Sequence, residues 1–266
     1  MDWYEEWFGE EYKLVYPHRN EAEAKEQIEF LKRHIHLPEG AKVLDLCCGC
    51  GRHAVEIDGL GYEVVGLDLS EELLDLACSR ASACNADINF IRCDMREIPY
   101  SNHFDLIVNF FTSFGYFDDD SDNIKVLTAI AKALKTGGKF LIDYMNPDSV
   151  AKSLVKRDEK DIADGIHVIQ ERWIDASPRR INKKITLIRD GKESFYRESV
   201  RMYSYEEMMD MLSGAGLRLT RDVNHVHYRA GLVFPNHAPK PLSEHRSQFH
   251  KEGPCRCGGY GGTRLS

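Results

Sequence analysis

The chain has 266 residues, of which 42% are hydrophobic, and its formal net charge is −8 with a pI near 5.8. This length suits one large domain, or a core domain with a smaller insertion. The acidic balance argues against binding along a nucleic-acid backbone, and no apolar run is long enough to predict a membrane span. The first eight residues, MDWYEEWF, lack the basic-then-apolar pattern of a signal peptide.

The cysteines are not spread like a disulfide framework, and free thiols in a reducing, cytoplasmic compartment are the better interpretation. Three of them, Cys47, Cys48 and Cys50, share one glycine-rich turn that could hold a metal. A turn that tight, without a second group of ligands, is a poor match to tetrahedral zinc. We therefore expect no metal, and small apolar side chains beside the turn instead.

Residues 1–37 predict an amphipathic helical segment. Ala24, Ile28 and Leu31 recur on one face at helical spacing, and Pro38 ends the helix. An aromatic stretch that begins at Trp3 comes before this helix.

Residues 38–145 then alternate between strands and helices. The expected strands are 42–46, 62–68, 88–93, 104–111 and 139–144, and the expected helices are 52–60, 70–81 and 122–134. Ser70 is placed to cap the second of these helices. Such alternation predicts an α/β fold: a doubly wound, Rossmann-like parallel sheet that binds its ligand at the carboxyl ends of the strands.

The rhythm changes after residue 145. Residues 167–174, 180–188 and 194–203 predict three strands without helices between them, which would form an antiparallel flap inserted at 146–203. The sequence RDGK at 189–192 predicts a hairpin turn. Ser204 and Glu207 match a capping box that begins a return helix, followed by a strand, within 204–234.

The last segment, 235–266, is rich in His, Pro, Gly and Arg, and we expect a disordered or divergent tail. Its His and Cys residues could also bind a metal. Residues 222–234 are the only stretch available to close the sheet. We therefore expect a divergent C-terminus, a damaged sheet edge and impaired activity.

The turn in VLDLCCGCGRHA, residues 43–54, contains the G-x-G-x-x-A pattern of dinucleotide sites. A nicotinamide cofactor, a metal and a different cofactor are the alternatives for it. Asp45 lies four residues before Gly49, where nicotinamide sites seldom have an acid but a sulfonium cofactor with a free amino group gains from one. Asp68 ends the second strand and could accept from ribose hydroxyls in either case.

The ordered set of motifs in residues 40–145 resembles the class I S-adenosylmethionine-dependent methyltransferases. The segments GRHA, VVGLDLS, CDMREIP, FFTSFGYF and GGKFLIDYMNP carry the resemblance. It is closest to small-molecule methyltransferases with an antiparallel flap, and sugar-amine N-methyltransferases are similar in the FGY region. The N-terminal helices would be the lid of such an enzyme.

This resemblance implies S-adenosylmethionine as the cofactor and a set of contacts to it. Gly49 and Gly51 would let the backbone approach the cofactor, and Asp45 would lie near its amino group. The remaining implied contacts are Asp68 with the ribose, Leu69, Asp94 and Met95 with the adenine, Asn109 and Phe110 at the end of the fourth strand, and Tyr16 and Arg19 over the methionine carboxylate.

Each implied role has a plainer alternative. Asp45 could cap a turn or pair with Arg52, and Asp94 could cap the turn before Pro99. Arg52 and His53 could contact a ligand or face solvent.

The resemblance implies methyl transfer to N or O of a small molecule by in-line displacement, for which a dedicated base is optional. Tyr116, Asn146 and Arg172 are the weak catalytic candidates. The segment NFFT at 109–112 lacks the two prolines of nucleic-acid amino-methyltransferases, so we expect no nucleic acid as partner, and the lack of a long apolar run predicts no membrane partner. A catalytically impaired cofactor-binding protein and an NAD-dependent oxidoreductase are the alternatives, and a homodimer is one open oligomeric state.

Overall fold

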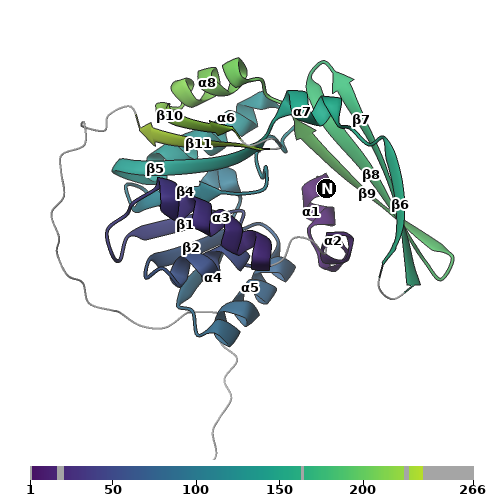
Figure 1. Cartoon of the computed structure of the whole chain (residues 1–266), viewed down its shortest axis with the longest axis horizontal. Coiled ribbons are helices and arrows are strands. Elements are labelled where there is room, and N and C mark those ends of the chain that lie inside the picture. Colours follow the sequence, from purple (N-terminus) through teal and green to yellow (C-terminus); the bar gives the residue numbers. More distant parts are fainter. Residues whose placement is uncertain (1, 17–20, 163–164, 225–227, 236–266) are drawn as a thin grey trace, which may run out of the picture.

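The computed structural model describes residues 2–16, 21–162, 165–224 and 228–235, and of residues 221–235 it describes the backbone alone (Figure 1). The helices are α1 (Trp3–Trp7), α2 (Glu10–Val15), α3 (Glu21–His34), α4 (Arg52–Asp58), α5 (Glu71–Cys84), the short 3-10 helix η1 (Met95–Glu97), α6 (Asp120–Ala133), α7 (Pro147–Lys152) and α8 (Tyr205–Gly214). The strands are β1 (Lys42–Leu46), β2 (Glu63–Asp68), β3 (Ile88–Arg92), β4 (Phe104–Asn109), β5 (Leu134–Met145), β6 (Arg157–Ile162), β7 (Ile166–Ala176), β8 (Arg179–Arg189), β9 (Lys192–Arg201), β10 (Leu217–Asn224) and β11 (Tyr228–Pro235).

Within the described residues the central sheet has seven strands in the order β10-β11-β5-β4-β1-β2-β3. Strands β1 to β5 pair in parallel, and β11 pairs antiparallel with both β5 and β10. The sequence prediction of a doubly wound, Rossmann-like sheet is confirmed. The order reverses between β1 and β4, which is where such sheets bind ligands.

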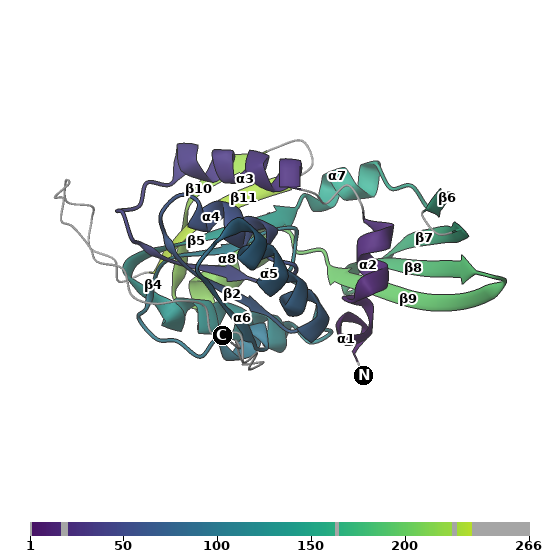
Figure 2. The same ribbon diagram turned by 90° about the horizontal axis from the view of Figure 1, so that it is seen from below.

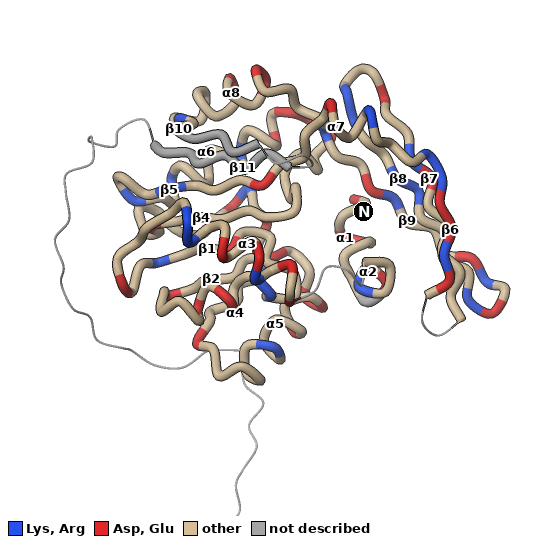
Figure 3. The backbone as a smooth tube through the Cα atoms, viewed as in Figure 1, with Lys and Arg blue, Asp and Glu red and all other residues tan. Residues whose placement is uncertain are grey.

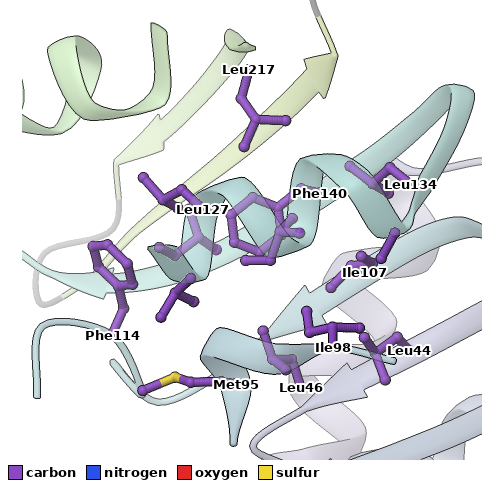
Figure 4. Close-up of a cluster of buried hydrophobic side chains, with 14 of the residues drawn as sticks. Leu44, Leu46, Met95, Ile98, Ile107, Phe114, Leu127, Leu134, Phe140 and Leu217 are labelled. Carbon is purple, nitrogen blue, oxygen red and sulfur yellow. The ribbon is translucent and has the colours of Figure 1, made fainter. Parts of the chain in front are cut away.

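Alternate residues of the parallel strands face two separate apolar cores, because successive side chains of a strand point to opposite faces. On one face Val43 and Leu106 pack with α3, α4 and α5 through residues such as Leu31 and Ile57. On the other face, Leu44 and Ile107 join the cluster drawn in Figure 4, which α6 and α8 cover. The sheet is therefore a rigid platform that holds its loop ends in place.

Local sequence signals set the element ends as predicted. The Ser70 hydroxyl accepts from the Leu73 N–H at the start of α5. Ser204 and Glu207 form the predicted capping box of α8. Asp190 and Gly191 both have positive φ, at 51° and 74°, and join β8 to β9 in the expected hairpin turn.

Strands β6 to β9 form a separate antiparallel sheet, the flap, which has four strands among the described residues rather than the three expected. The missed strand is β6, with the sequence RDEKDI. Its five charged residues hide any apolar alternation. They also suit an edge strand, because exposed charges discourage further strand pairing.

The expectation of a damaged sheet edge is wrong for the chain up to Pro235. Residues 228–235 pair with β5 along 140–145 and with β10 on the other side, so this stretch closes the sheet. The segment GLVF contains a β-branched and an aromatic residue, Val233 and Phe234, and both residue types favour strands. Of the predicted tail, 235–266, Pro235 ends β11, and residues 236–266, including the His and Cys residues considered as metal ligands, lie outside the described residues.

Helices α1 and α2, here called the lid, lie between the central sheet and the flap (Figures 1 and 2). The Ser70 hydroxyl donates to the Phe8 carbonyl at 2.7 Å and ties the lid to the core. On the flap side, Glu198 accepts from the Trp7 indole N–H at 2.7 Å and from the Tyr16 hydroxyl at 2.5 Å. The lid thus contacts both the core around the central sheet and the flap, and it lies between them.

Candidate cofactor and acceptor site

A cavity of about 1040 Å³, measured to its open mouth, lies at the carboxyl ends of β1, β2 and β4. We call it the loop cavity. Its walls come from the glycine turn after β1, the ends of β2 and β3, the segment after β4, and the lid.

Asp68 ties the glycine turn to the end of β2. Its Oδ2 accepts from the Gly49 N–H at 2.8 Å and its Oδ1 accepts from the Ser70 N–H at 2.9 Å. Burial raises the pKa of Asp68, and these backbone donors lower it again. Each carboxylate oxygen has a second lone pair, so Asp68 can still accept hydroxyl donors from a ligand in the cavity.

Gly49 and Gly51 both have positive φ, but they serve different purposes. Gly49 lines the loop cavity, where an added Cβ would meet only Leu73 at 3.9 Å. Gly51 does not line it. A Cβ there would lie 2.9 Å from the Ala77 side chain and 3.1 Å from Phe90, so this glycine permits close packing of α5 and the sheet.

Asp45 is a buried acid at the floor of the cavity. It is 1% exposed, and its Oδ2 has no hydrogen-bond partner among the described residues. Burial, and next the charge of Asp68, raises the pKa of Asp45 to about 7, against smaller opposing effects of the Ala54 N–H and Arg52. A buried acceptor of this kind is completed by a cationic donor from a ligand.

Asp94 already has protein partners. Its Oδ1 caps η1 by accepting from the Arg96 N–H at 2.8 Å, and its Oδ2 pairs with the Arg96 guanidinium at 2.6 Å. The plainer alternative, a capped turn before Pro99, therefore describes the local structure. Asp94 nevertheless lines the cavity beside Met95 and Cys93, although Arg96 already donates to both of its carboxylate oxygens.

An aromatic wall follows β4. The Phe110 ring stacks on His53 with centroids 4.4 Å apart, and both side chains line the cavity. Burial lowers the pKa of His53 to about 3, so this imidazole stays neutral. Its Nε2 lies 2.7 Å from the Gln27 Oε1, which orients the ring.

The next two residues have unusual backbones. Phe111 and Thr112 have φ of 59° and 55°, a region that costs energy for residues other than glycine. Asp143 of β5 holds this turn, because its carboxylate accepts from the Phe111 N–H at 3.2 Å and its carbonyl from the Thr112 N–H at 2.9 Å. The turn aims the Phe111 ring between the core and the lid.

The structure brings most predicted cofactor residues together. The loop cavity is lined by Asp45, Gly49, Asp68, Leu69, Asp94, Met95 and Phe110. Their roles stay predictions, but their common location supports them.

Four predicted residues stand apart. Asn109 is buried behind the cavity, where its amide donates to the Leu46 carbonyl at 3.0 Å. Gly51 serves packing, as described above. Tyr16 binds Glu198 on the flap and does not line the loop cavity, so its placement does not support a carboxylate contact. Arg19 lies outside the described residues.

The lid supplies cavity residues that the sequence prediction did not single out. Tyr4, Phe8, Tyr12 and Lys13 all line the loop cavity. Their aromatic clustering and the resemblance to methyltransferases with a helical lid were the available signals, but neither showed which of these side chains would line the cavity. Lys13 and Arg52 are cations of this lining, and Arg52 also lies 3.7 Å from Glu23.

A second cavity, of about 820 Å³, lies between the lid, the segment after β4 and the flap. We call it the flap cavity. It shares Phe8, Tyr12, Phe111 and Tyr116 with the loop cavity, so these four rings form the junction of the two. The two cavities are thus neighbours separated by aromatic side chains alone.

The far wall of the flap cavity is charged. Arg172, Lys183 and Glu198 stand side by side on adjacent strands, because Arg172 pairs with Lys183 and Lys183 with Glu198 in the sheet register. Lys183 lies 3.1 Å from Glu198, and Arg172 pairs with Asp158. Figure 3 shows basic and acidic residues interspersed along these flap strands.

The three catalytic candidates lie in different settings. Tyr116 lies at the junction and Arg172 lines the flap cavity. Asn146 lines neither; its Oδ1 accepts from the Asp148 and Ser149 N–H groups and caps α7. We therefore regard Asn146 as a structural cap.

In the part of the chain that the structure describes, no group of three His, Cys, Asp or Glu residues is placed to hold a metal ion. Burial raises the pKa of Cys47 and Cys48 well above the ordinary thiol value, so these thiols stay protonated. The same described residues include no helix with the length and hydropathy of a membrane span.

Comparison with known proteins agrees with this geometry. A family model described as a methyltransferase domain matches residues 43–138, which contain the glycine turn, Asp68, Asp94 and the aromatic wall. Residues 43–138 are therefore a methyltransferase domain, and the chain has the fold of solved S-adenosylmethionine-dependent methyltransferases. An amino pentose methyltransferase from Micromonospora echinaspora, solved with S-adenosylmethionine bound, has the same fold, with a TM-score of 0.63 at 18% identity over 84% of this chain and 96% of its own.

Individual relatives cover most of the chain at low identity. The Bacillus subtilis protein named "Putative methyltransferase YqeM" is 28% identical over 70% of this chain and 76% of its own length. A Streptomyces venezuelae protein named dTDP-3-amino-3,4,6-trideoxy-alpha-D-glucopyranose N,N-dimethyltransferase is 25% identical over 68% of this chain and 77% of its own. A solved S-adenosylmethionine-dependent methyltransferase from Clostridium acetobutylicum superposes with a TM-score of 0.70 at 20% identity, covering 84% of this chain and 95% of its own.

The residues of the loop cavity fit this cofactor. The unpartnered Oδ2 of Asp45 suits an amino group, and Gly49 leaves room where the backbone meets the ligand. Lys13 and Arg52 offer positive charge for a carboxylate. The buried Asp68 keeps lone pairs for ribose hydroxyls.

Proposed function

We propose that this methyltransferase moves a methyl group to the nitrogen of a small-molecule amine, by in-line displacement at the junction of its two cavities. The cofactor, when bound, supplies a methyl group that its sulfonium sulfur has already activated. The protein then has to orient the acceptor, exclude water and let one proton leave.

The observation that carries this proposal is the composition of the junction. Phe8, Tyr12, Phe111 and Tyr116 line both cavities, and no Asp, Glu, His or Lys among the described residues does. A hydroxyl acceptor must lose its proton as it attacks, which calls for a base at the reacting atoms. A neutral amine attacks through its own lone pair, and the faces of aromatic rings stabilise the cationic nitrogen that develops.

The placement of the flap cavity supports a small acceptor. The cavity lies beside the loop cavity and shares four aromatic residues with it. Its opposite wall carries Arg172, Lys183 and Glu198, which can orient polar groups away from the reacting nitrogen. The relative from Streptomyces venezuelae, named as an amino-sugar N,N-dimethyltransferase, is consistent with a nitrogen acceptor.

Roles follow for the residues of the loop cavity. Asp68 would hold the ribose, Leu69, Asp94 and Met95 the adenine, and Asp45 the amino group of the cofactor. Lys13 and Arg52 would bind the cofactor carboxylate in place of Tyr16, and Arg19, which was also expected there, lies outside the described residues. Tyr12 and Tyr116 would bound the path of the methyl group and keep water from it.

The test begins with calorimetric titration of the full chain with S-adenosylhomocysteine, with NAD in a parallel titration. We expect micromolar binding of the first and none of the second. Matched pairs of small amines and alcohols of the same carbon skeleton are then incubated with S-adenosylmethionine, and S-adenosylhomocysteine release is measured. Turnover with amines alone supports the proposal, and turnover with the alcohols instead refutes the nitrogen assignment. Tight binding without turnover of any acceptor would favour a catalytically silent protein.

A further inference from the structure

The segment between β4 and α6 carries much of the active site without regular secondary structure. Residues 110–117 supply walls to the loop cavity, and Tyr116 lines both cavities. Positive φ at Phe111, Thr112 and Gly115 shows that the backbone leaves extended geometry three times here. Something outside this segment must hold its second half, because Asp143 contacts only its start.

Arg180 of the flap makes that contact. Its guanidinium donates to three successive carbonyls of the segment: Phe117 at 2.9 Å, Tyr116 at 3.1 Å and Gly115 at 3.3 Å. It also donates to Ser199 on the neighbouring flap strand, through the hydroxyl at 3.0 Å and the carbonyl at 2.9 Å. One side chain therefore joins two flap strands to the segment at the cavity junction.

The burial of the Arg180 guanidinium indicates a role other than stabilising the fold. Arg180 is 6% exposed, and burial lowers the pKa of its guanidinium. Its acidic neighbour, Asp118, lies 3.7 Å away and is itself exposed. A cation buried largely against neutral carbonyls gains little net stability over an apolar side chain, whereas the planar fork defines geometry well.

The backbone of Arg201 also joins this segment to the flap. The Arg201 N–H donates to the Gly115 carbonyl at 2.8 Å, and a Cβ on Gly115 would lie 3.2 Å from the Arg201 carbonyl oxygen. The segment thus lies directly against β9, and glycine is needed at 115 for this approach. Strands β8 and β9 also supply Ile181, Lys183 and Val200 to the flap cavity.

We propose that Arg180 is a positioning residue that sets the segment 115–117 against the flap, so that the cofactor-side and acceptor-side walls keep one fixed relation. It touches neither cavity itself and acts through the backbone of Tyr116 and Phe117. Displacement of such walls by even about 1 Å is enough to lower turnover strongly.

The test uses the full chain and S-adenosylhomocysteine, so its result does not depend on which acceptor the enzyme takes. Arg180→Met and Arg180→Lys are compared with the control Arg179→Met, whose neighbouring guanidinium contacts Asp148 and the Pro147 carbonyl on the surface. We expect the affinity for S-adenosylhomocysteine to fall about tenfold in both Arg180 variants and to stay unchanged in the control. Lysine keeps the charge but cannot reach three carbonyls at once.

Two further readouts separate positioning from general destabilisation. Amide hydrogen exchange across 111–117 should accelerate in the Arg180 variants while exchange in β1 and β4 stays as in the unmodified protein. Millimolar guanidinium should restore the affinity of Arg180→Ala. Equal affinity in Arg180→Lys and the control, or a loss that guanidinium does not restore and that follows the unfolded fraction, would overturn the proposal.

Discussion

The loop cavity takes its acidic side chains from the ends of neighbouring parallel strands, whereas the flap cavity takes its walls from segments far apart in the chain. Asp45 and Asp68 reach the same place because β1 and β2 are hydrogen-bonded neighbours. Trp3, Tyr116 and Lys183 meet only because the lid and the flap pack beside the sheet. The loop cavity therefore depends mainly on the sheet, and the flap cavity depends on how the lid and the flap pack beside the sheet.

This difference separates cofactor binding from acceptor binding. The junction of four aromatic residues is the one wall that both cavities share among the described residues. Substitutions of the acids that line the loop cavity should therefore change cofactor affinity, and a side chain that fills the flap cavity should change turnover. The predictions below test this separation, beginning with the largest effect.

Asp68→Ala should abolish the loop cavity as a cofactor site. The change removes a carboxylate that holds the Gly49 and Ser70 N–H groups, so both the ligand contact and the turn are lost. Each hydrogen bond to a charged group contributes about 1.5–3 kcal/mol, so we expect at least a ~100-fold loss of affinity for S-adenosylhomocysteine. Calorimetry measures it, with the exposed Asp87→Ala as control. Unchanged affinity would show that Asp68 does not contact the cofactor.

Ile181→Trp should fill the flap cavity without touching the loop cavity. We expect turnover of an amine acceptor to fall about 100-fold, because the acceptor no longer reaches the junction. The affinity for S-adenosylhomocysteine should stay within about twofold. Ile188→Trp lies on the same strand outside both cavities and is the control. A parallel loss of cofactor affinity would mean that the cavities are not separable.

Asp45→Asn should change how stability depends on pH. Burial beside Asp68 raises the pKa of Asp45 to about 7 in the folded protein, above its unfolded value of about 3.8. The folded state therefore holds this proton more tightly, and stability present below pH 4 is lost as the pH rises through 7. Asparagine does not titrate, so the variant should be more stable than the unmodified protein at pH 8, by up to about 4 kcal/mol.

Urea unfolding at pH 4 and pH 8 checks this prediction. The difference between the two proteins should shrink at the lower pH, because both then carry a neutral side chain at position 45. A constant difference across this pH range would contradict the raised pKa. Binding of S-adenosylhomocysteine should weaken in the variant, because the amide lacks the charge that pairs with an amino group.

Glu198→Gln should loosen the lid with the smallest effect of the four. Glu198 accepts from Trp7 and Tyr16 and pairs with Lys183, and glutamine keeps one acceptor oxygen but loses the charge. We expect hydrogen exchange in residues 3–15 to accelerate and cofactor affinity to fall about threefold. The exposed Glu193→Gln on the same strand is the matched control. Equal exchange in both variants would show that the lid is held by apolar packing alone.

The order of strands and helices in the sheet and the position of the glycine turn could be predicted from the sequence alone. Strand and helix periodicity, the cap at Ser70 and the acids after β1 and β2 are local signals, and the parallel order follows from alternating strands and helices. Strand β6 was not predicted from the sequence, because its charged residues hide the alternation of a strand. The expectation of a damaged sheet edge was wrong, because the segment GLVF forms a strand that pairs with β5. These local signals are readable because their physical causes lie within a few residues.

The residues that line the flap cavity, and the different roles of residues close together in the sequence, could be seen only in the folded structure. Gly49 lines the loop cavity, while Gly51 allows α5 to pack closely against the turn. Tyr16 hydrogen-bonds to Glu198 of the flap, while Tyr12 lines both cavities. Likewise Arg180 gives no sequence signal, because its partners are backbone carbonyls some 65 residues earlier in the chain. Contacts between distant segments depend on how the lid and flap pack, and packing of this kind leaves no periodic pattern in a single sequence.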